Sequence, residues 1–127
     1  MSDDQFDKGL TVRKLVLGAE YVARAEANKT DFDADFQRYV TENAWGAVWT
    51  RPGLEKNIRS MLTIAMLASL GRHEELGAHI RATRNTGVTR NEVKEVLLQV
   101  AVYAGAPAAN TAFAVAKRVY QEMDDQR

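Results

Sequence analysis

The chain has 127 residues, 17 basic and 17 acidic side chains, and no cysteine. Because the charges cancel, no broad positive field exists to draw the protein onto nucleic acid or a membrane surface, and we expect neither as a partner. The lack of cysteine excludes disulfides, thiolate metal sites, thiol nucleophiles and dithiol redox centres. The acidic N-terminus lacks the features of a signal peptide and no apolar run is long enough to span a membrane, so a cytoplasmic protein is expected.

Nothing in the sequence suggests a linker or an internal repeat. Only two prolines occur, Pro52 and Pro107, and no stretch is rich in Ser, Gly or Pro. A chain of this length can bury roughly two-thirds of the surface that its unfolded form exposes, which is enough for folding without a metal or a disulfide. We therefore predict a single domain over residues 1–127.

The N-terminal part of the chain predicts three helices. Apolar residues recur at helical spacing across residues 6–27, and Gly18 should divide this segment into two short helices. Thr30 is expected to cap a third helix that runs to about Trp45. Residues 49–53 are predicted to form a loop, because a proline disfavours the helical conformation of the residue before it.

The rest of the chain predicts further helices, and no segment alternates like a strand. The expected ranges are 54–70, 72–85, 89–105 and 107 onwards. Gly71 and Gly87 are expected to end helices, and Thr89 with Glu92 should form a capping box. Pro107 suits the first turn of the last helix. The predicted fold class is all-α, a compact helical domain of about six helices.

Two of these segments, residues 61–70 and 96–109, are apolar on nearly every side. A helix that is apolar all round is normally buried, and one small bundle offers limited burial to two such helices. We therefore expect contacts between subunits to cover part of them, so that the protein is a homo-oligomer. The alternative is that both segments lie in the core of the monomer.

His79 is the candidate catalytic residue. It follows Glu75 by four residues, so on a helix the carboxylate can orient the imidazole, fix its tautomer and favour its protonated form. The spacing is that of an acid–base dyad, and the alternative, common on helices, is an ordinary surface pair. The other histidine, His73, stands in a charged first turn and is expected to be solvated. Because zinc takes three or four ligands and His73 lies on a poorly matched face, no metal site is predicted.

Two tryptophans and an arginine surround the predicted loop, namely Trp45, Trp49 and Arg51. Aromatic rings and a guanidinium together can line an apolar pocket that holds one carboxylate. The alternative is a packed corner whose arginine faces solvent.

Segments across nearly the whole chain carry a resemblance. They are residues 45–54, 59–63, 70–79, 85–90, 92–99 and 103–110. Together they resemble the carboxymuconolactone decarboxylase family of the alkylhydroperoxidase-like superfamily. The GVTR segment at 87–90 is common in the superfamily, whereas WTRPGL at 49–54 and PAAN at 107–110 are more particular to the decarboxylases. Peroxidase relatives carry Cys-x-x-Cys and then a histidine, and here Arg72, Glu75 and His79 take those places, so peroxidase chemistry is not expected.

The resemblance implies an all-α, alkylhydroperoxidase-like fold, a hexameric assembly with sites near subunit contacts, and no cofactor. It also implies a carboxy-lyase that converts 4-carboxymuconolactone, a γ-carboxylated butenolide of protocatechuate breakdown, to 3-oxoadipate enol-lactone in the β-ketoadipate pathway. Two alternatives remain: a superfamily enzyme with a drifted substrate, and a non-catalytic helical module that binds a small aromatic or lactone acid.

The chemistry of this lactone explains why no cofactor is needed. Loss of carbon dioxide pushes electrons through the ring double bond into the lactone carbonyl, so the substrate is its own electron sink. The resulting dienolate needs an acid that returns a proton to ring carbon. We predict that His79, oriented by Glu75, is that acid.

The remaining site residues are predicted to bind substrate. Arg51 or Arg59 should hold the acetate carboxylate that stays on the product. Trp45 and Trp49 should keep the departing carboxylate dry, which favours its loss as neutral carbon dioxide.

Overall fold

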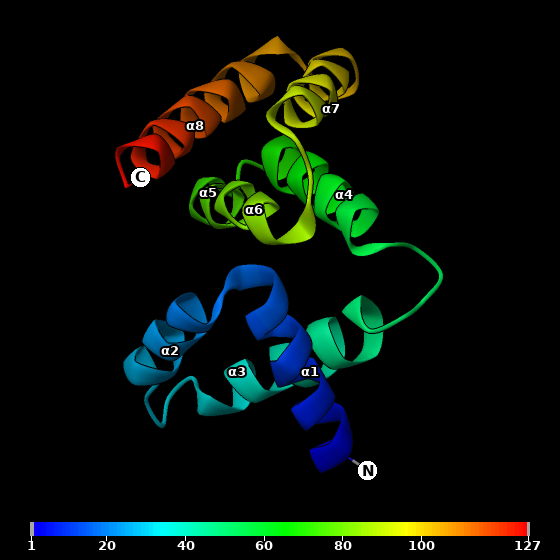
Figure 1. The fold of residues 1–127 in the computed structure, drawn as a ribbon, viewed down its shortest axis with the longest axis vertical. Coiled ribbons are helices and arrows are strands. Elements are labelled where there is room, and N and C mark those ends of the chain that lie inside the picture. The colour runs from blue at the N-terminus through cyan, green and yellow to red at the C-terminus, as the bar shows by residue number, and fades with distance from the viewer. Residues whose placement is uncertain (1, 127) are drawn as a thin grey trace. The chain divides into compact units, whose positions relative to one another are not determined.

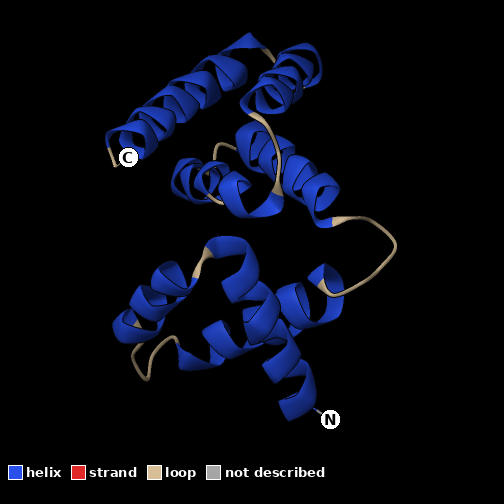
Figure 2. Ribbon diagram, in the orientation of Figure 1, coloured by secondary structure: helices blue, strands red, loops and turns tan. Residues whose placement is uncertain are grey.

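The computed structural model describes residues 2–126, and every regular element in that range is a helix (Figure 2). The all-α prediction is therefore confirmed for the described residues. The packing divides the chain into two compact units, Met1–Glu55 and Lys56–Arg127. The single domain expected from the length stays a prediction.

The first unit contains four helical elements, which run from blue to blue-green in Figure 1. They are α1 (Ser2–Leu17), α2 (Ala19–Asn28), α3 (Ala34–Val40) and η1 (Thr41–Trp49). As predicted, Gly18 separates the first two helices, and its φ of 96° is one that glycine adopts readily. Helix α1 packs mainly against η1, a π-helix in which each N–H bonds the carbonyl five residues earlier.

The predicted helix from Thr30 to Trp45 is wrong at both ends. Thr30 lies in a turn, where its hydroxyl accepts a hydrogen bond from the Phe32 amide at 3.3 Å and its amide donates to the Asp33 carboxylate at 2.8 Å. These local bonds compete with helix formation, so α3 begins only at Ala34. At the other end the chain continues as η1 through Trp49, and the predicted loop begins after that residue.

The second unit contains five helices, which run from green to red in Figure 1. They are α4 (Lys56–Leu70), α5 (His73–Arg81), α6 (Thr83–Thr86), α7 (Arg90–Tyr103) and α8 (Ala106–Asp125). Helix α4 packs against α5, α7 and α8, and α8 also packs against α5 and α7. The fully buried side chains at the centre of this core include Ile64, Leu76, Ile80 and Leu97.

Most predicted helix ends in the second unit are confirmed. Gly71 and Gly87 adopt left-handed conformations after α4 and α6, with φ of 71° and 83°. The capping box is present, since the Glu92 amide donates to the Thr89 hydroxyl at 3.0 Å and the Thr89 amide donates to the Glu92 carboxylate at 2.9 Å. Pro107 lies in the first turn of α8.

Three boundaries in the second unit differ from the prediction. The helix expected from residue 54 begins at Lys56, and the one expected to reach residue 105 ends at Tyr103. The single helix expected over residues 72–85 is divided into α5 and α6. At this break the Thr83 hydroxyl donates to the Ile80 carbonyl at 2.6 Å, which offers the backbone an alternative to a continuous helix.

Helices α4 and α7 are apolar on nearly every side, and some of their large apolar side chains are exposed to solvent. Ile58, Leu62, Met66 and Leu70 follow one another at four-residue spacing along α4, and they are 38–66 % exposed. Leu98, Val102 and Tyr103 of α7 are 48–84 % exposed. None of the helices in residues 2–126 combines the length and the hydropathy needed to cross a membrane.

Candidate functional site

His79 lies in the last turn of α5, on the flank of a helix whose other face enters the core. Its neighbours Leu76, Gly77 and Ile80 are buried, and α5 packs against α8. The amphipathic pattern of α5 therefore holds the backbone of His79 against a rigid core.

Burial dominates the electrostatics of His79. Its Nδ1 atom is out of contact with solvent. Burial lowers the pKa of His79 from 6.5 to about 4, whereas the negative charge of Glu75 acts to raise that pKa. Glu75 thus has the effect predicted from its spacing, but burial outweighs it. The imidazole is neutral at neutral pH, so the expected protonated form does not describe the free protein.

The second histidine has a different environment. His73 opens α5 and is exposed, as predicted. Glu75 is also exposed, so the predicted pair consists of one half-buried imidazole and one carboxylate in contact with solvent. His73 therefore offers a matched control for substitutions of His79.

Arg59 supplies a cationic group in the same unit. It lies on α4, which packs against α5, and its side chain is half-buried. Its Nε atom is shielded from solvent and has no hydrogen-bond partner among the described residues. The next residue, Ser60, is fully buried and accepts a hydrogen bond from the Thr86 hydroxyl at 3.1 Å, which ties this part of α4 to α6. A buried donor without a partner is costly, so this guanidinium is well suited to an anion.

The two tryptophans come together in the first unit. Trp45 and Trp49 lie on η1, are 5 % and 7 % exposed, and stack with ring centroids 5.0 Å apart and an angle of 26° between the planes. Arg51 follows in the turn after η1, where its amide donates to the Val48 carbonyl at 3.0 Å, and its side chain is exposed. This geometry is the one expected of a packed corner, and the predicted binding roles of these three residues stay predictions.

A hollow in the second unit lies between α4 and α7. It has a volume of about 480 Å³, and its apolar wall includes Ile58, Leu62 and Val96. Glu92 and Glu95 also line it. No residue predicted for the site lies there, and carboxylates disfavour a ligand that is itself an anion. This hollow is therefore a poor candidate for binding a dicarboxylate.

Within residues 2–126, no three His, Asp or Glu side chains come together as a group that could hold a metal ion. The donor set around His79 consists of one imidazole and one exposed carboxylate, fewer than the three or four ligands of a zinc site. The expectation of a metal-free protein stays a prediction that a chelator can test.

Comparison with known proteins identifies the family. The chain is 47 % identical over 124 residues to a 4-carboxymuconolactone decarboxylase from Acinetobacter baylyi, covering 97 % of this chain and 92 % of the relative. It is 44 % identical over 121 residues to nitrosuccinic acid decarboxylase npaB from Metarhizium robertsii, covering 95 % and 85 %. A 15.0 kDa protein from Paracoccus denitrificans is 31 % identical over 68 % of the chain and 66 % of the relative. The family pattern matches residues 34–118, and the chain belongs to the carboxymuconolactone decarboxylase family.

Proposed function

We propose that this protein is a carboxy-lyase that converts 4-carboxymuconolactone to 3-oxoadipate enol-lactone in protocatechuate catabolism. The observation that carries the proposal is the match of 97 % of the chain, at 47 % identity, to a decarboxylase named for that substrate. The structure adds support, because it has an imidazole with a shielded Nδ1 atom near a carboxylate, and a shielded guanidinium nitrogen without a partner.

The reaction balances without an external oxidant or reductant. The bond from the ring carbon to its carboxylate breaks, and carbon dioxide leaves. The electron pair moves through the ring double bond and onto the carbonyl oxygen of the lactone. A proton then adds to the carbon next to the carbonyl, which leaves the double bond on the carbon that lost the carboxylate. The protein must therefore supply one proton and stabilise one anion.

His79 is proposed as the proton donor. In the free protein its imidazole is neutral, because its pKa is about 4. The substrate carries two carboxylates, and negative charge near an imidazole favours the protonated form. Substrate binding therefore raises the pKa of His79, so that the acid forms in the complex. Glu75 acts in the same direction and keeps the imidazolium stable until the proton is transferred.

Arg59 is proposed to hold the acetate carboxylate that stays on the product. Of the two arginines considered, Arg59 has the shielded Nε atom without a partner, whereas the Arg51 side chain is exposed. A hydrogen bond from a shielded guanidinium stabilises a bound carboxylate more than a bond from an exposed guanidinium, because water competes for the exposed group. Trp45 and Trp49 are proposed to exclude water from the departing carboxylate.

The direct test supplies the purified protein with freshly prepared 4-carboxymuconolactone labelled in the departing carboxylate. We expect labelled carbon dioxide to appear at the rate at which the enol-lactone forms. Saturable binding without product would instead identify a binding module. An excess of chelator should leave the rate unchanged, and inhibition that a divalent ion reverses would contradict the metal-free mechanism.

A second candidate is the decarboxylation of a 2-nitro acid, which the relative named for nitrosuccinic acid favours. Both compounds carry the departing carboxylate and a carboxymethyl group on the same carbon, and both have an electron sink bonded to that carbon. In nitrosuccinate the sink is the nitro group, and protonation of the nitronate gives 3-nitropropanoate. Parallel assays of the two compounds decide between them, since the true substrate should have the higher kcat/KM.

We also propose that the protein is a cytoplasmic homo-oligomer, a hexamer by resemblance. Ile58, Leu62, Met66 and Leu70 form an exposed apolar stripe along α4. This stripe supports an assembly, because contiguous apolar surface marks an interaction site. Met66→Glu would place a charge in the middle of the stripe, and size-exclusion chromatography with light scattering should then show a smaller species. Met66→Leu, which keeps the same surface apolar, is the control. A monomeric wild-type protein would contradict this proposal.

A further inference from the structure

The π-helix η1, which carries both tryptophans, is nine residues long. π-Helical segments are rare, are mostly a single turn long, and occur frequently at functional sites. Such a segment persists only where its surroundings stabilise it against the α-helix. The polar and packing contacts of η1 show what stabilises it.

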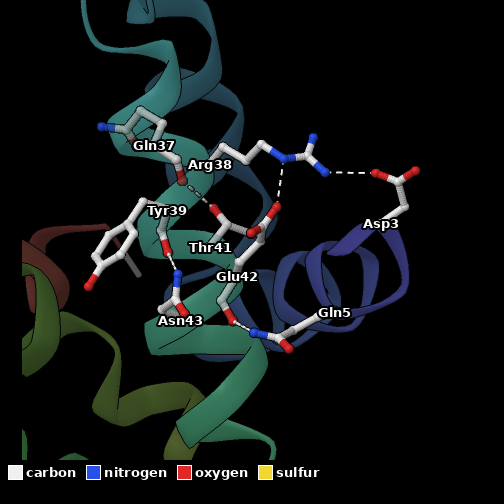
Figure 3. A network of polar contacts seen from close by, with 8 residues as sticks. All are labelled: Asp3, Gln5, Gln37, Arg38, Tyr39, Thr41, Glu42 and Asn43. Atoms are coloured by element: carbon white, nitrogen blue, oxygen red, sulfur yellow. Dashed lines mark hydrogen bonds and ion pairs between the residues drawn. The ribbon is translucent and has the colours of Figure 1, made fainter. Parts of the chain in front are cut away.

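Side chains in and beside η1 take up backbone carbonyls. The Thr41 hydroxyl donates to the Gln37 carbonyl at 2.8 Å, and the Asn43 amide donates to the Tyr39 carbonyl at 3.0 Å (Figure 3). At the C-terminal end of η1 the Thr50 hydroxyl donates to the Gly46 carbonyl at 2.6 Å. In each case the acceptor lies four residues before the donor, and the Gln37 carbonyl also accepts from the Thr41 amide. These side chains therefore add hydrogen bonds to backbone carbonyls along the segment.

Helix α1 adds contacts from a distant part of the sequence. The Gln5 side-chain amide donates to the Glu42 carbonyl at 2.7 Å, and Arg38 lies between the carboxylates of Asp3 and Glu42 (Figure 3). The buried Arg13 guanidinium also approaches the Thr41 hydroxyl at 3.4 Å. The carbonyl of a π-helical residue is thus held by a donor 37 residues away.

Two glycines let the backbones of α1 and η1 touch. An added Cβ on Gly9 would overlap the Thr41 carbonyl oxygen and lie 2.7 Å from the Gly46 nitrogen. An added Cβ on Gly46 would overlap the Gln5 carbonyl oxygen and lie 2.9 Å from its Cγ. Because backbone atoms cannot move aside cheaply, any larger residue would force the two helices apart.

We propose that Gly9, Gly46 and Gln5 are positioning residues that set the stacking geometry of Trp45 and Trp49. Close contact with α1 keeps the segment π-helical, and the π-helical turn determines how one ring lies over the other. An α-helix has fewer residues per turn, so relaxation of η1 would rotate Trp49 relative to Trp45. The inference rests on the proposed function, in which these rings exclude water from the departing carboxylate.

The test combines a spectroscopic and a kinetic measurement on full-length variants. Stacked indoles give an exciton couplet in the circular dichroism spectrum, and Gly46→Ala should reduce it. Gln5→Ala, which deletes one hydrogen bond and adds no bulk, is the milder variant if Gly46→Ala does not fold. For the folded variants, kcat on the lactone should fall on the order of tenfold while KM changes less, because a small misplacement acts mainly on the chemical step.

Two controls separate positioning from general destabilisation. An added Cβ on Gly53 meets no atom within 4 Å, so Gly53→Ala should keep the couplet. Lys14 is exposed on α1, so Lys14→Ala should keep both the couplet and kcat. An unchanged couplet in Gly46→Ala or Gln5→Ala would overturn the inference. A lost couplet with unchanged kcat would support the control of the geometry by α1 and contradict the proposed role of the two rings in the reaction. A wild-type protein inactive on the lactone would refute the proposed function instead, and the couplet would still decide whether α1 sets the geometry.

Discussion

For His79, the sequence predicts the effect of Glu75 correctly but not the protonation state of the imidazole. Its spacing from Glu75 predicts a carboxylate that stabilises the imidazolium, and the structure agrees on the sign of that effect. Spacing along one helix contains no information on burial, which depends on everything packed around the helix. Burial has the larger effect here, and it leaves the free protein with a neutral imidazole.

Replacing His79 by alanine should lower kcat by roughly two to four orders of magnitude, as loss of a general acid usually does. The measurement is the steady-state rate of carbon dioxide release at saturating lactone. His73→Ala, the exposed histidine of the same helix, should retain the wild-type rate. A near-normal rate in His79→Ala would show that this imidazole is structural.

Arg59→Ala should raise the KM for the lactone by roughly 10- to 100-fold, because a charge-assisted hydrogen bond contributes about 1.5–3 kcal/mol. Arg51→Ala should have a smaller effect, since its side chain is exposed. Initial-rate measurements over a range of lactone concentrations give both values. If Arg51→Ala raises KM more than Arg59→Ala does, the carboxylate is held by Arg51.

At the scale of elements, local signals predict helix ends well and distant contacts explain the failures. Gly71 and the capping box of Thr89 and Glu92 involve residues only a few positions apart, so the sequence contains all that is needed to predict them. The π-helix could not be predicted in this way. Its conformation depends on α1, and the bond from Gln5 to Glu42 joins residues 37 positions apart.

The capping box gives an element-scale prediction. Thr89→Ala removes the acceptor of the Glu92 amide and should lower the free energy of unfolding by about 1 kcal/mol. Urea unfolding followed by circular dichroism measures the change. Thr111→Ala is the control, because that exposed hydroxyl donates to the Pro107 carbonyl inside α8 and caps no helix end. Equal losses in the two variants would mean that the box contributes nothing specific.

At the scale of the whole molecule, the lowered pKa of His79 makes stability depend on pH. The pKa of His79 is about 4 in the folded protein and about 6.5 in the unfolded chain, so between these values the unfolded chain binds more protons. The free energy of unfolding therefore decreases as the pH falls through this window, by roughly 3 kcal/mol in total from this group.

His79→Gln should remove that part of the pH dependence, whereas His73→Gln should keep it. Urea unfolding at several pH values between 7.5 and 4 measures both slopes. Carboxylates elsewhere contribute equally to all three proteins, so the difference between slopes isolates one imidazole. Parallel curves for wild type and His79→Gln would mean that His79 is as solvated in the folded protein as in the unfolded chain.

The uncharged state of His79 in the free protein has a consequence for selectivity. If His79 becomes protonated only when the doubly negative substrate binds, the substrate itself creates the acid that protonates its carbanion. A mono-ester of the lactone, blocked at the acetate arm, keeps the leaving carboxylate but brings half the charge. Such an ester would bind but would raise the pKa of His79 less. Its kcat would therefore fall by a larger factor than its affinity.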